Sequence, residues 1–218
     1  MTDVNPTPGL RERKRLATRR AIQVAVLRLV AERGYDAVTV EMISRSADVS
    51  PRTFFNYFPS KEDAVVGDPP RMPSGEPEEA FVRGEPTGEL LGDIVVLLDE
   101  AMAENITDRE LVLERRKVLR QHPDLFARRS ASLHEFESEL TAVVSRRLLR
   151  DEPDLESDPA QLASRAQLLG LVIMAALRHA WAQWLEGAAG AADTHPADTA
   201  DALGHHLDDS FAALRDLL

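Results

Sequence analysis

The chain has 218 residues, 44% of them hydrophobic, with 26 Lys and Arg, 37 Asp and Glu, and a formal net charge of −11. This length and composition suit a folded protein of one or two domains, and the absence of cysteine excludes a disulfide framework, a thiolate zinc site and a cysteine nucleophile. The net charge by itself argues against nucleic acid as a partner, because phosphates are bound by Lys and Arg.

The charge is distributed unevenly along the chain. Residues 10–61 contain eleven Lys and Arg and five Asp and Glu, a net charge of +6, so the remaining residues carry −17. A basic N-terminal quarter on an acidic body favours a nucleic-acid-binding module joined to a regulatory or assembly domain. Charge alone leaves a second interpretation open, in which these residues are the solvated faces of ordinary helices.

Helical periodicity dominates the chain, and no segment shows sustained alternation of apolar and polar residues. Near the N-terminus it predicts helices over 16–33, 40–47 and 51–57, and a further helix opening at Ser60. Ser50 followed by Pro51 is an N-cap with proline at the first helical position.

Residues 67–88 contain five prolines and four glycines. We therefore predict an irregular connector there, between an N-terminal domain over 10–66 and a helical body over 89–218.

The body is predicted to contain long helices, several of which open with a clear cap. Thr107 and Glu110 form a capping box, and Asp158, Pro159 and Gln161 combine an N-cap, a proline and a capping-box glutamine. A Gly/Ala-rich loop over 187–192 precedes the last helix. The fold class is therefore all-α, with roughly nine helices. Those of the body are predicted over 89–104, 107–121, 123–150, 158–186 and 196–218.

The window 39–58 predicts a helix-turn-helix, since two short helices flank a turn of about three residues. Asp48 suits the turn because Asp tolerates left-handed backbone better than most residues. The second helix begins Ser-Pro-Arg-Thr, so its first turn can enter a major groove, where Arg52 can bind guanine through two hydrogen bonds.

With these motifs the sequence resembles the TetR-type bacterial transcriptional repressors over about residues 13–66. The resemblance rests on R-x-A-I at 19–22, R-G-Y-D-A-V-T-V at 33–40, V-S-P-R-T at 49–53 and N-Y-F-P-S-K-E-D-A at 56–64. It implies three small helices for DNA and a helical body that dimerises and holds a small effector.

The resemblance also implies roles for particular residues. It places Thr39, Thr53 and Tyr57 on phosphates, and Lys61 on the DNA backbone at the start of the fourth helix. The positions facing base edges are Ser50, Pro51 and Arg52, and Asn56 completes the predicted site.

Three positions depart from the family's usual pattern. Asp48 stands where Gly is common, and Phe55 stands where Tyr is common, so a contact of Phe55 with DNA would be apolar. Arg45 is outside the pattern and is kept as a phosphate contact. Phe54 and Phe58 are expected in the core of the small domain.

The last two helices, about 158–186 and 196–218, carry apolar stripes that suit a four-helix interface between two copies. One stripe includes Ile173 and Trp184, a second includes Leu168 and Val172, and the last helix carries Leu203, Leu207 and Phe211. We expect a homodimer that binds a palindromic operator. The competing interpretation is that both helices close the core of a single copy.

The body is expected to bind a small effector, and hydrophobic compounds are among the expected classes. Large residues that could line such a pocket are Met102, Phe126, Met174, Trp181 and Trp184. At helical spacing these residues are more often ordinary core, and none is assigned to the pocket.

Enzymatic and metal-binding patterns are poor. Dinucleotide, phosphate-loop, zinc-protease and nucleophile-elbow motifs are absent from the sequence. His205 and His206 with Asp201, Asp208 and Asp209 suggest a metal site only weakly, because adjacent helical residues point about 100° apart. We expect no catalytic residue, no metal and no cofactor.

The apolar run 166–177 is shorter than the roughly 20 residues that a membrane span needs, and no leader pattern is found at the start. We therefore expect a cytoplasmic protein without a membrane partner. The sequence favours a ligand-responsive repressor. Two alternatives are weighed against it, a helical interaction adaptor with a vestigial DNA head and a helical-bundle enzyme.

Overall fold

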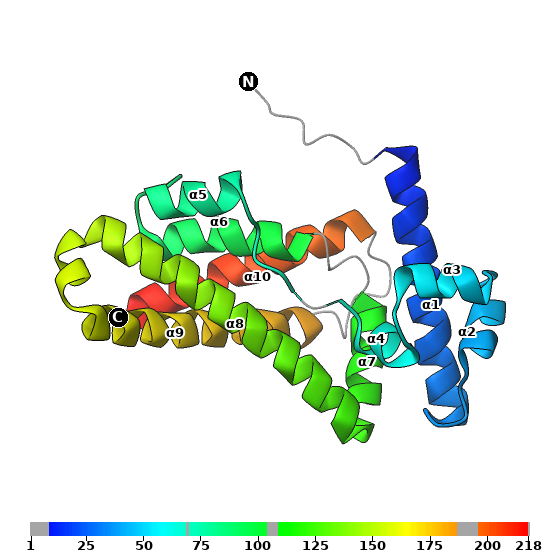
Figure 1. Ribbon diagram of the computed structural model, residues 1–218. Helices are drawn as coiled ribbons and strands as arrows, with labels where there is room; N and C mark the ends of the chain where they lie inside the picture. The colour runs from blue at the N-terminus through cyan, green and yellow to red at the C-terminus, as the bar shows by residue number, and fades with distance from the viewer. Residues whose placement is uncertain (1–8, 69, 104–108, 187–195, 218) are drawn as a thin grey trace. The chain divides into compact units, whose positions relative to one another are not determined.

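A computed structural model describes residues 9–68, 70–103, 109–186 and 196–217, and over these ranges the chain forms helices and no strands (Figure 1). The prediction of an all-α fold is confirmed. The described helices are α1 (Leu10–Arg33), α2 (Val40–Ser46), α3 (Pro51–Tyr57), α4 (Lys61–Val66), α5 (Glu76–Arg83), α6 (Leu90–Ala103), α7 (Arg109–Gln121), α8 (Pro123–Asp151), the 3-10 helix η1 (Pro153–Ser157), α9 (Pro159–Glu186) and α10 (Pro196–Leu217).

Capping side chains fix the starts of the short N-terminal helices. Thr39, Ser50 and Ser60 each accept a hydrogen bond from the backbone N–H three residues further on, which satisfies a donor that the helix leaves unpaired. Asp158 caps α9 in the same way, at 3.0 Å from the N–H of Gln161. The predicted cap at Thr107 and the predicted loop over 187–192 lie outside the described residues.

The structure differs from the predicted helices in three places, one of which is the additional short helix η1. α1 begins at Leu10, six residues earlier than predicted, because Arg and Lys are good helix formers even where no apolar face is needed. α5 lies inside the predicted connector, with Pro77 in its first turn, where proline is tolerated, and with Gly84 as a left-handed cap at its end.

The chain divides into two compact units. The first combines residues 1–68 with 110–128, and the second combines 69–109 with 129–218. The first unit thus takes in α7 and the start of α8, which the predicted boundary assigns to the body. The physical reason is burial, since Val118, Leu119 and Leu125 belong to the same apolar cluster as α1 and α4.

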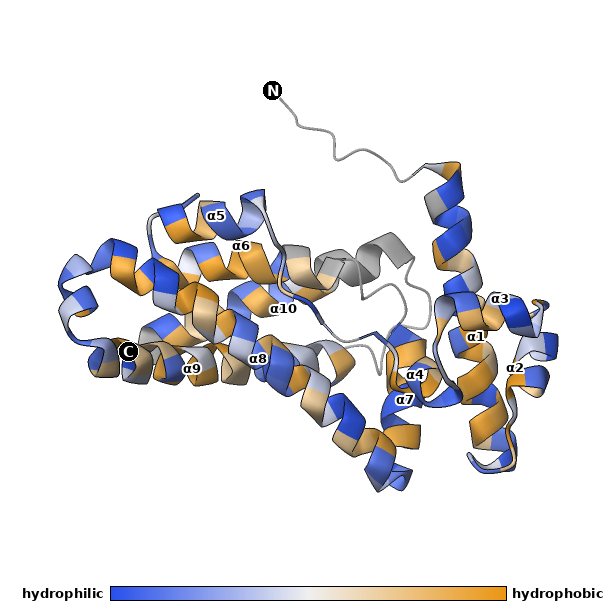
Figure 2. Cartoon of the chain, viewed as in Figure 1, coloured by the Kyte–Doolittle hydropathy of each residue, from blue (hydrophilic) through white to orange (hydrophobic). Residues whose placement is uncertain are grey.

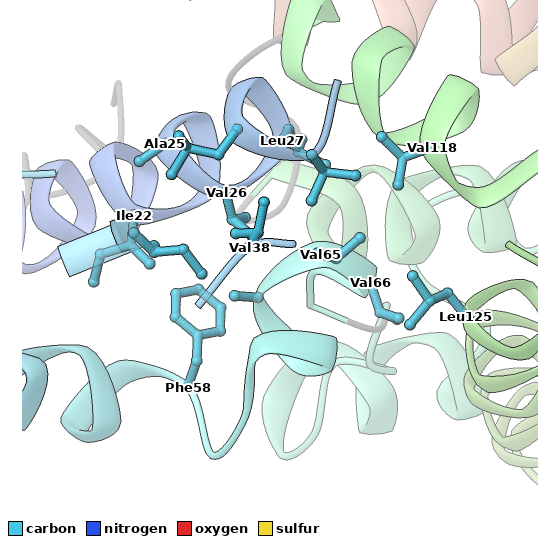
Figure 3. Packing of buried hydrophobic residues seen from close by; sticks show 14 of the residues in the cluster. Ile22, Ala25, Val26, Leu27, Val38, Phe58, Val65, Val66, Val118 and Leu125 are labelled. Atoms are coloured by element: carbon cyan, nitrogen blue, oxygen red, sulfur yellow. The ribbon is translucent and has the colours of Figure 1, made fainter. Parts of the chain in front are cut away.

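Figure 3 shows this cluster, which holds the first unit together. Ile22, Val26 and Leu27 of α1 pack with Val65 of α4, and all four are at most 2% exposed. Phe54 and Phe58 are also buried here, which confirms their expected place in the core. α3 is therefore anchored from its inner side.

The second unit has its own core, built from apolar faces of α6, α8, α9 and α10 (Figure 2). α10 packs against both α9 and α6. Leu203, Leu207 and Phe211 are at most 2% exposed, so the stripe of the last helix closes the core of a single copy. For these three residues the burial agrees with the competing interpretation, and the predicted interface between two copies stays a prediction.

A buried ion pair supports the same unit. The guanidinium of Arg147 on α8 donates to Asp93 of α6 and to the backbone carbonyl oxygens of Phe81 and Gly88, and its Nε donates to Asp151. Burial of Asp93 opposes its ionisation, but the hydrogen bonds from Thr87 and the Arg147 charge outweigh burial and lower the pKa of Asp93.

By length and composition alone, α9 could cross a membrane, and it is the one such helix among those described. The sequence prediction, based on the shorter run 166–177, did not anticipate this. Core helices of soluble proteins meet the same criterion, and Ile173, Ala180 and Trp184 of α9 are buried within the unit.

Candidate nucleic-acid interface

α2 and α3 form the predicted helix-turn-helix, joined by residues 47–50. Asp48 in this turn has φ of 53°, the left-handed conformation that the sequence predicts for it. The next N–H, that of Val49, donates to the carbonyl of Ser44 at 2.9 Å. Ile43 and Phe54, one from each helix, are fully buried, so the two helices meet through apolar side chains.

The outer face of α3 presents most of the residues predicted to meet base edges. Ser50, Pro51, Arg52 and Asn56 are exposed. Phe55 is 55% exposed, whereas Phe54 beside it is fully buried and meets the Phe55 ring edge-on at 5.4 Å between centroids. One helix thus carries an anchored inner side and a free outer side of mixed polar and apolar character.

Thr53 and Tyr57 of α3 are half-buried, between its exposed face and its buried side. The hydroxyl oxygens of Thr53 and Ser50 are 2.8 Å apart, and the Thr53 N–H donates to the Ser50 hydroxyl at 3.0 Å. Tyr57 packs against the apolar cluster of the unit. These two side chains therefore border the exposed face of α3.

On α2 the predicted residues lie at opposite ends of the helix. Thr39 is the exposed N-cap, and its hydroxyl oxygen accepts from the N–H of Met42 at 3.3 Å. Arg45 is exposed in the last turn, where a cation also suits the negative end of the helix dipole.

Lys61 has a structural role that the sequence did not predict. Its ammonium group donates to the carbonyl oxygens of Tyr35 and Val38 at 2.9 and 3.0 Å, and its nitrogen lies 4.0 Å from the centroid of the Tyr35 ring. An ammonium has three N–H donors, so these bonds leave one for a phosphate oxygen. Lys61 joins the start of α4 to the segment between α1 and α2.

Tyr35 is a second residue whose role sequence reasoning missed. Its hydroxyl donates to the Glu62 carboxylate, and its ring packs against that of His122 at 5.2 Å between centroids. Burial and the bond to Glu62 raise the pKa of Tyr35, and the same bond lowers the pKa of Glu62. The available signal was an aromatic residue directly after Gly34, where α1 ends.

Arg19 fixes the far end of α3. Its Nε donates to Asp68 at 2.8 Å, its Nη1 donates to the Tyr57 carbonyl at 2.9 Å, and its guanidinium carbon lies 4.2 Å from the centroid of the Phe58 ring. The sequence signal was an arginine three residues before Ile22, on the side of α1 that carries its apolar residues. Arg19 therefore helps to set the position of α3 on the core.

Within the part of the chain that the structure describes, no three His, Cys, Asp or Glu side chains lie close enough to hold a metal ion. The side chain of Asp201, one of the weak metal candidates, is outside that part. The exposed face of α3 and the basic residues around it thus remain the candidate site.

Comparisons with known proteins point in the same direction. Residues 22–65 match the family model of bacterial regulatory proteins, tetR family. The HTH-type transcriptional regulator TcmR of Streptomyces glaucescens is 29% identical over 161 residues, which cover 69% of this chain and 68% of TcmR. Native NalD of Pseudomonas aeruginosa, described as the secondary repressor of the MexAB-OprM multidrug efflux pump, is similar in fold, with a TM-score of 0.50 and 20% identity over 89% of this chain and 96% of NalD.

Proposed function

We propose that the chain, whose residues 22–65 match the tetR family model and which is 29% identical to TcmR over 161 residues, is a DNA-binding transcriptional regulator that acts as a ligand-responsive repressor. In this proposal a homodimer binds a palindromic operator and leaves it when a small effector binds. The likeness to NalD supports the fold of this assignment and nothing more specific.

The observation that carries the proposal is the exposed face of α3. Arg52, Phe55 and Asn56 stand on a helix whose opposite side is anchored by Phe54 and Phe58. A guanidinium, an apolar ring and an amide are the groups that distinguish guanine, thymine and adenine in a major groove. The residues on phosphates would be Thr39, Arg45, Thr53, Tyr57 and Lys61, with Ser50 and Pro51 completing the contact with base edges.

The proposed dimer interface lies on α9. Leu168 is 64% exposed and Leu171 is 48% exposed, one helical turn apart, while the stripe through Ile173 is already buried. Exposed leucines paired in this way suit burial against a second copy across a two-fold axis. Two copies would place two α3 helices on half-sites about one DNA turn apart, or a small multiple of that distance.

The effector is proposed to bind within the second unit. Met102, Met174 and Trp184 are buried there, and Trp181 packs edge-on against Trp184 at 5.3 Å between centroids. Phe126 belongs to the first unit and is 56% exposed, so it is not part of that core. The effector can weaken DNA binding only by its difference in affinity for the two states of the dimer. A regulator of bacterial DNA would act in the cytoplasm.

Binding selection tests the proposal. The full chain is incubated with a pool of random duplexes, the bound sequences are recovered over several rounds, and the affinity for the selected duplex is measured between about 50 and 200 mM salt. We expect a palindromic consensus, two chains per duplex and a steep fall of affinity with salt. Absence of salt-dependent binding would contradict the proposal and favour the adaptor. A metabolite panel added to the complex then identifies compounds that release the DNA.

A further inference from the structure

The first turns of α1 carry a dense group of basic residues. Residues 10–20 contain six Lys and Arg and one acidic residue, and all of them lie in the helix, which begins at Leu10. Arg11, Arg13, Lys14 and Arg15 are exposed. Their place in a regular helix gives each of these side chains a defined direction.

Three of the four share one face of the helix. At 100° per residue, Arg11, Lys14 and Arg15 lie within about 100° of one another, and Arg11 and Arg15 begin the stripe that continues through Arg19 and Ile22. Lys14 lies at the edge of this face, about 140° from Arg19. Arg13 points to the opposite side of the helix, about 200° from Arg11. The stripe is apolar where α1 crosses the core and becomes basic where the helix leaves it.

The stripe meets the end of α3 at Arg19, one turn beyond its basic part. Arg19, one turn from Arg15, donates to the carbonyl of Tyr57, the last residue of α3. From Arg19 to Arg11 the helix rises about 12 Å, at 1.5 Å per residue. Figure 1 shows these first turns of α1 extending past α3.

Resting on the proposed function, we propose that Arg11, Lys14 and Arg15 form a phosphate-binding face of α1 that extends the DNA contact beyond the helix-turn-helix. The partner is the backbone of the same duplex that α3 occupies. Charge complementarity carries the choice of partner, because three cations within two helical turns match a strand with one phosphate about every 3.4 Å of its axis. Contacts of this kind position a protein on DNA and carry no sequence preference.

Two charge-matched double variants test the proposal. The first is Arg11→Gln with Arg15→Gln, which changes two residues on the side of α1 that carries Arg19. The second is Arg13→Gln with Arg20→Gln, which removes the same charge from the opposite face of α1. Equal helical content and equal melting temperature for both variants and the wild type show that the exposed changes leave the fold intact.

The readout is the affinity for the selected duplex and for a random duplex of equal length, measured across salt concentrations. We expect the first variant to lower the slope of log K against log salt by about 1.8, two phosphates at about 0.9 each, on both duplexes alike. When salt is raised from 50 to 200 mM, the factor by which affinity falls would then be about ten times smaller for this variant than for the wild type. The opposite-face variant should keep the wild-type slope.

Equal slopes for the wild type and both variants would overturn the proposed face while leaving the repressor proposal intact. Equal reductions in both variants would overturn it too, because the effect would then come from net charge and not from one face. A wild-type chain that shows no salt-dependent binding would overturn the proposed function itself.

Discussion

The guanidinium of Arg147 and the carboxylate of Asp93 lie 2.8 Å apart, and both side chains are fully buried. Arg147 also donates hydrogen bonds to two backbone carbonyl oxygens and to Asp151. Asp93 accepts two hydrogen bonds from Thr87, one from the backbone N–H and one from the hydroxyl. The pair thereby joins α8 to α6 and to the end of α5. A buried charge that loses its partner stays dehydrated without compensation, so the two residues depend on each other.

Replacing Arg147 with Met should therefore lower the free energy of unfolding by about 3–5 kcal/mol, measured by urea denaturation. Arg146→Met is the matched control, since Arg146 is a neighbouring arginine with exposed ion pairs to Glu78 and Glu79, and it should cost less than about 1 kcal/mol. Adding Asp93→Asn to Arg147→Met should recover part of the loss. Equal costs for the two single variants would contradict the role given to the buried pair.

The turn of the helix-turn-helix offers a test of backbone strain. Asp48→Gly should raise the free energy of unfolding by up to about 1 kcal/mol, because glycine adopts the left-handed conformation without a steric penalty. Asp48→Ala should lower it by a similar amount. Thermal melting of the three proteins gives the order Gly, Asp, Ala, and a more stable Ala variant would show that φ is not what limits this position.

Arg52→Ala should relax sequence preference at one base pair in each half-site by about 1–3 kcal/mol, as expected for loss of a bidentate contact with guanine. The measurement is the sequence profile recovered by binding selection. Arg45→Ala is the control, since it removes an exposed arginine from α2 and should weaken all sequences alike. An unchanged profile for Arg52→Ala would remove this residue from base recognition.

Lys61→Met should have two separable effects. Loss of the hydrogen bonds to the carbonyl oxygens of Tyr35 and Val38 should lower the free energy of unfolding. The upper limit is about 1.5–3 kcal/mol for each bond. Loss of a phosphate contact should weaken binding to every duplex and lower the salt slope by about 0.9. If stability falls while the slope stays the same, Lys61 is structural only, and a loss confined to the operator would contradict a phosphate role.

The exposed leucines of α9 test the proposed dimer. Leu168→Glu with Leu171→Glu should produce a monomer in sedimentation experiments, because two carboxylates cannot be buried in an apolar interface without partners. Leu133→Glu, an exposed leucine on α8, is the control and should leave the dimer unchanged. A double variant that stays dimeric would place the interface on another surface.

The local features of this protein were predictable from its sequence. Apolar spacing gave the helices, and short-range chemistry gave their starts at Thr39, Ser50 and Ser60, because capping and left-handed turns involve residues only a few positions apart. The separation of charge between the N-terminal quarter and the remainder was likewise visible without coordinates. The sequence also placed Phe54 in the core of the small domain, and the structure buries it.

The long-range contacts required the tertiary structure. Arg147 with Asp93, Lys61 with Tyr35, and Arg19 with Asp68 join residues 26 to 54 positions apart, and no local pattern pairs them. The same holds for α7, which packs with α1 and α4 because Val118 is buried there. The apolar stripes of α9 and α10 were visible in the sequence. Only the packing showed that Leu203, Leu207 and Phe211 of α10 are buried within one copy, while Leu168 and Leu171 of α9 remain exposed. Burial depends on what lies opposite a face, and that is a property of the folded chain.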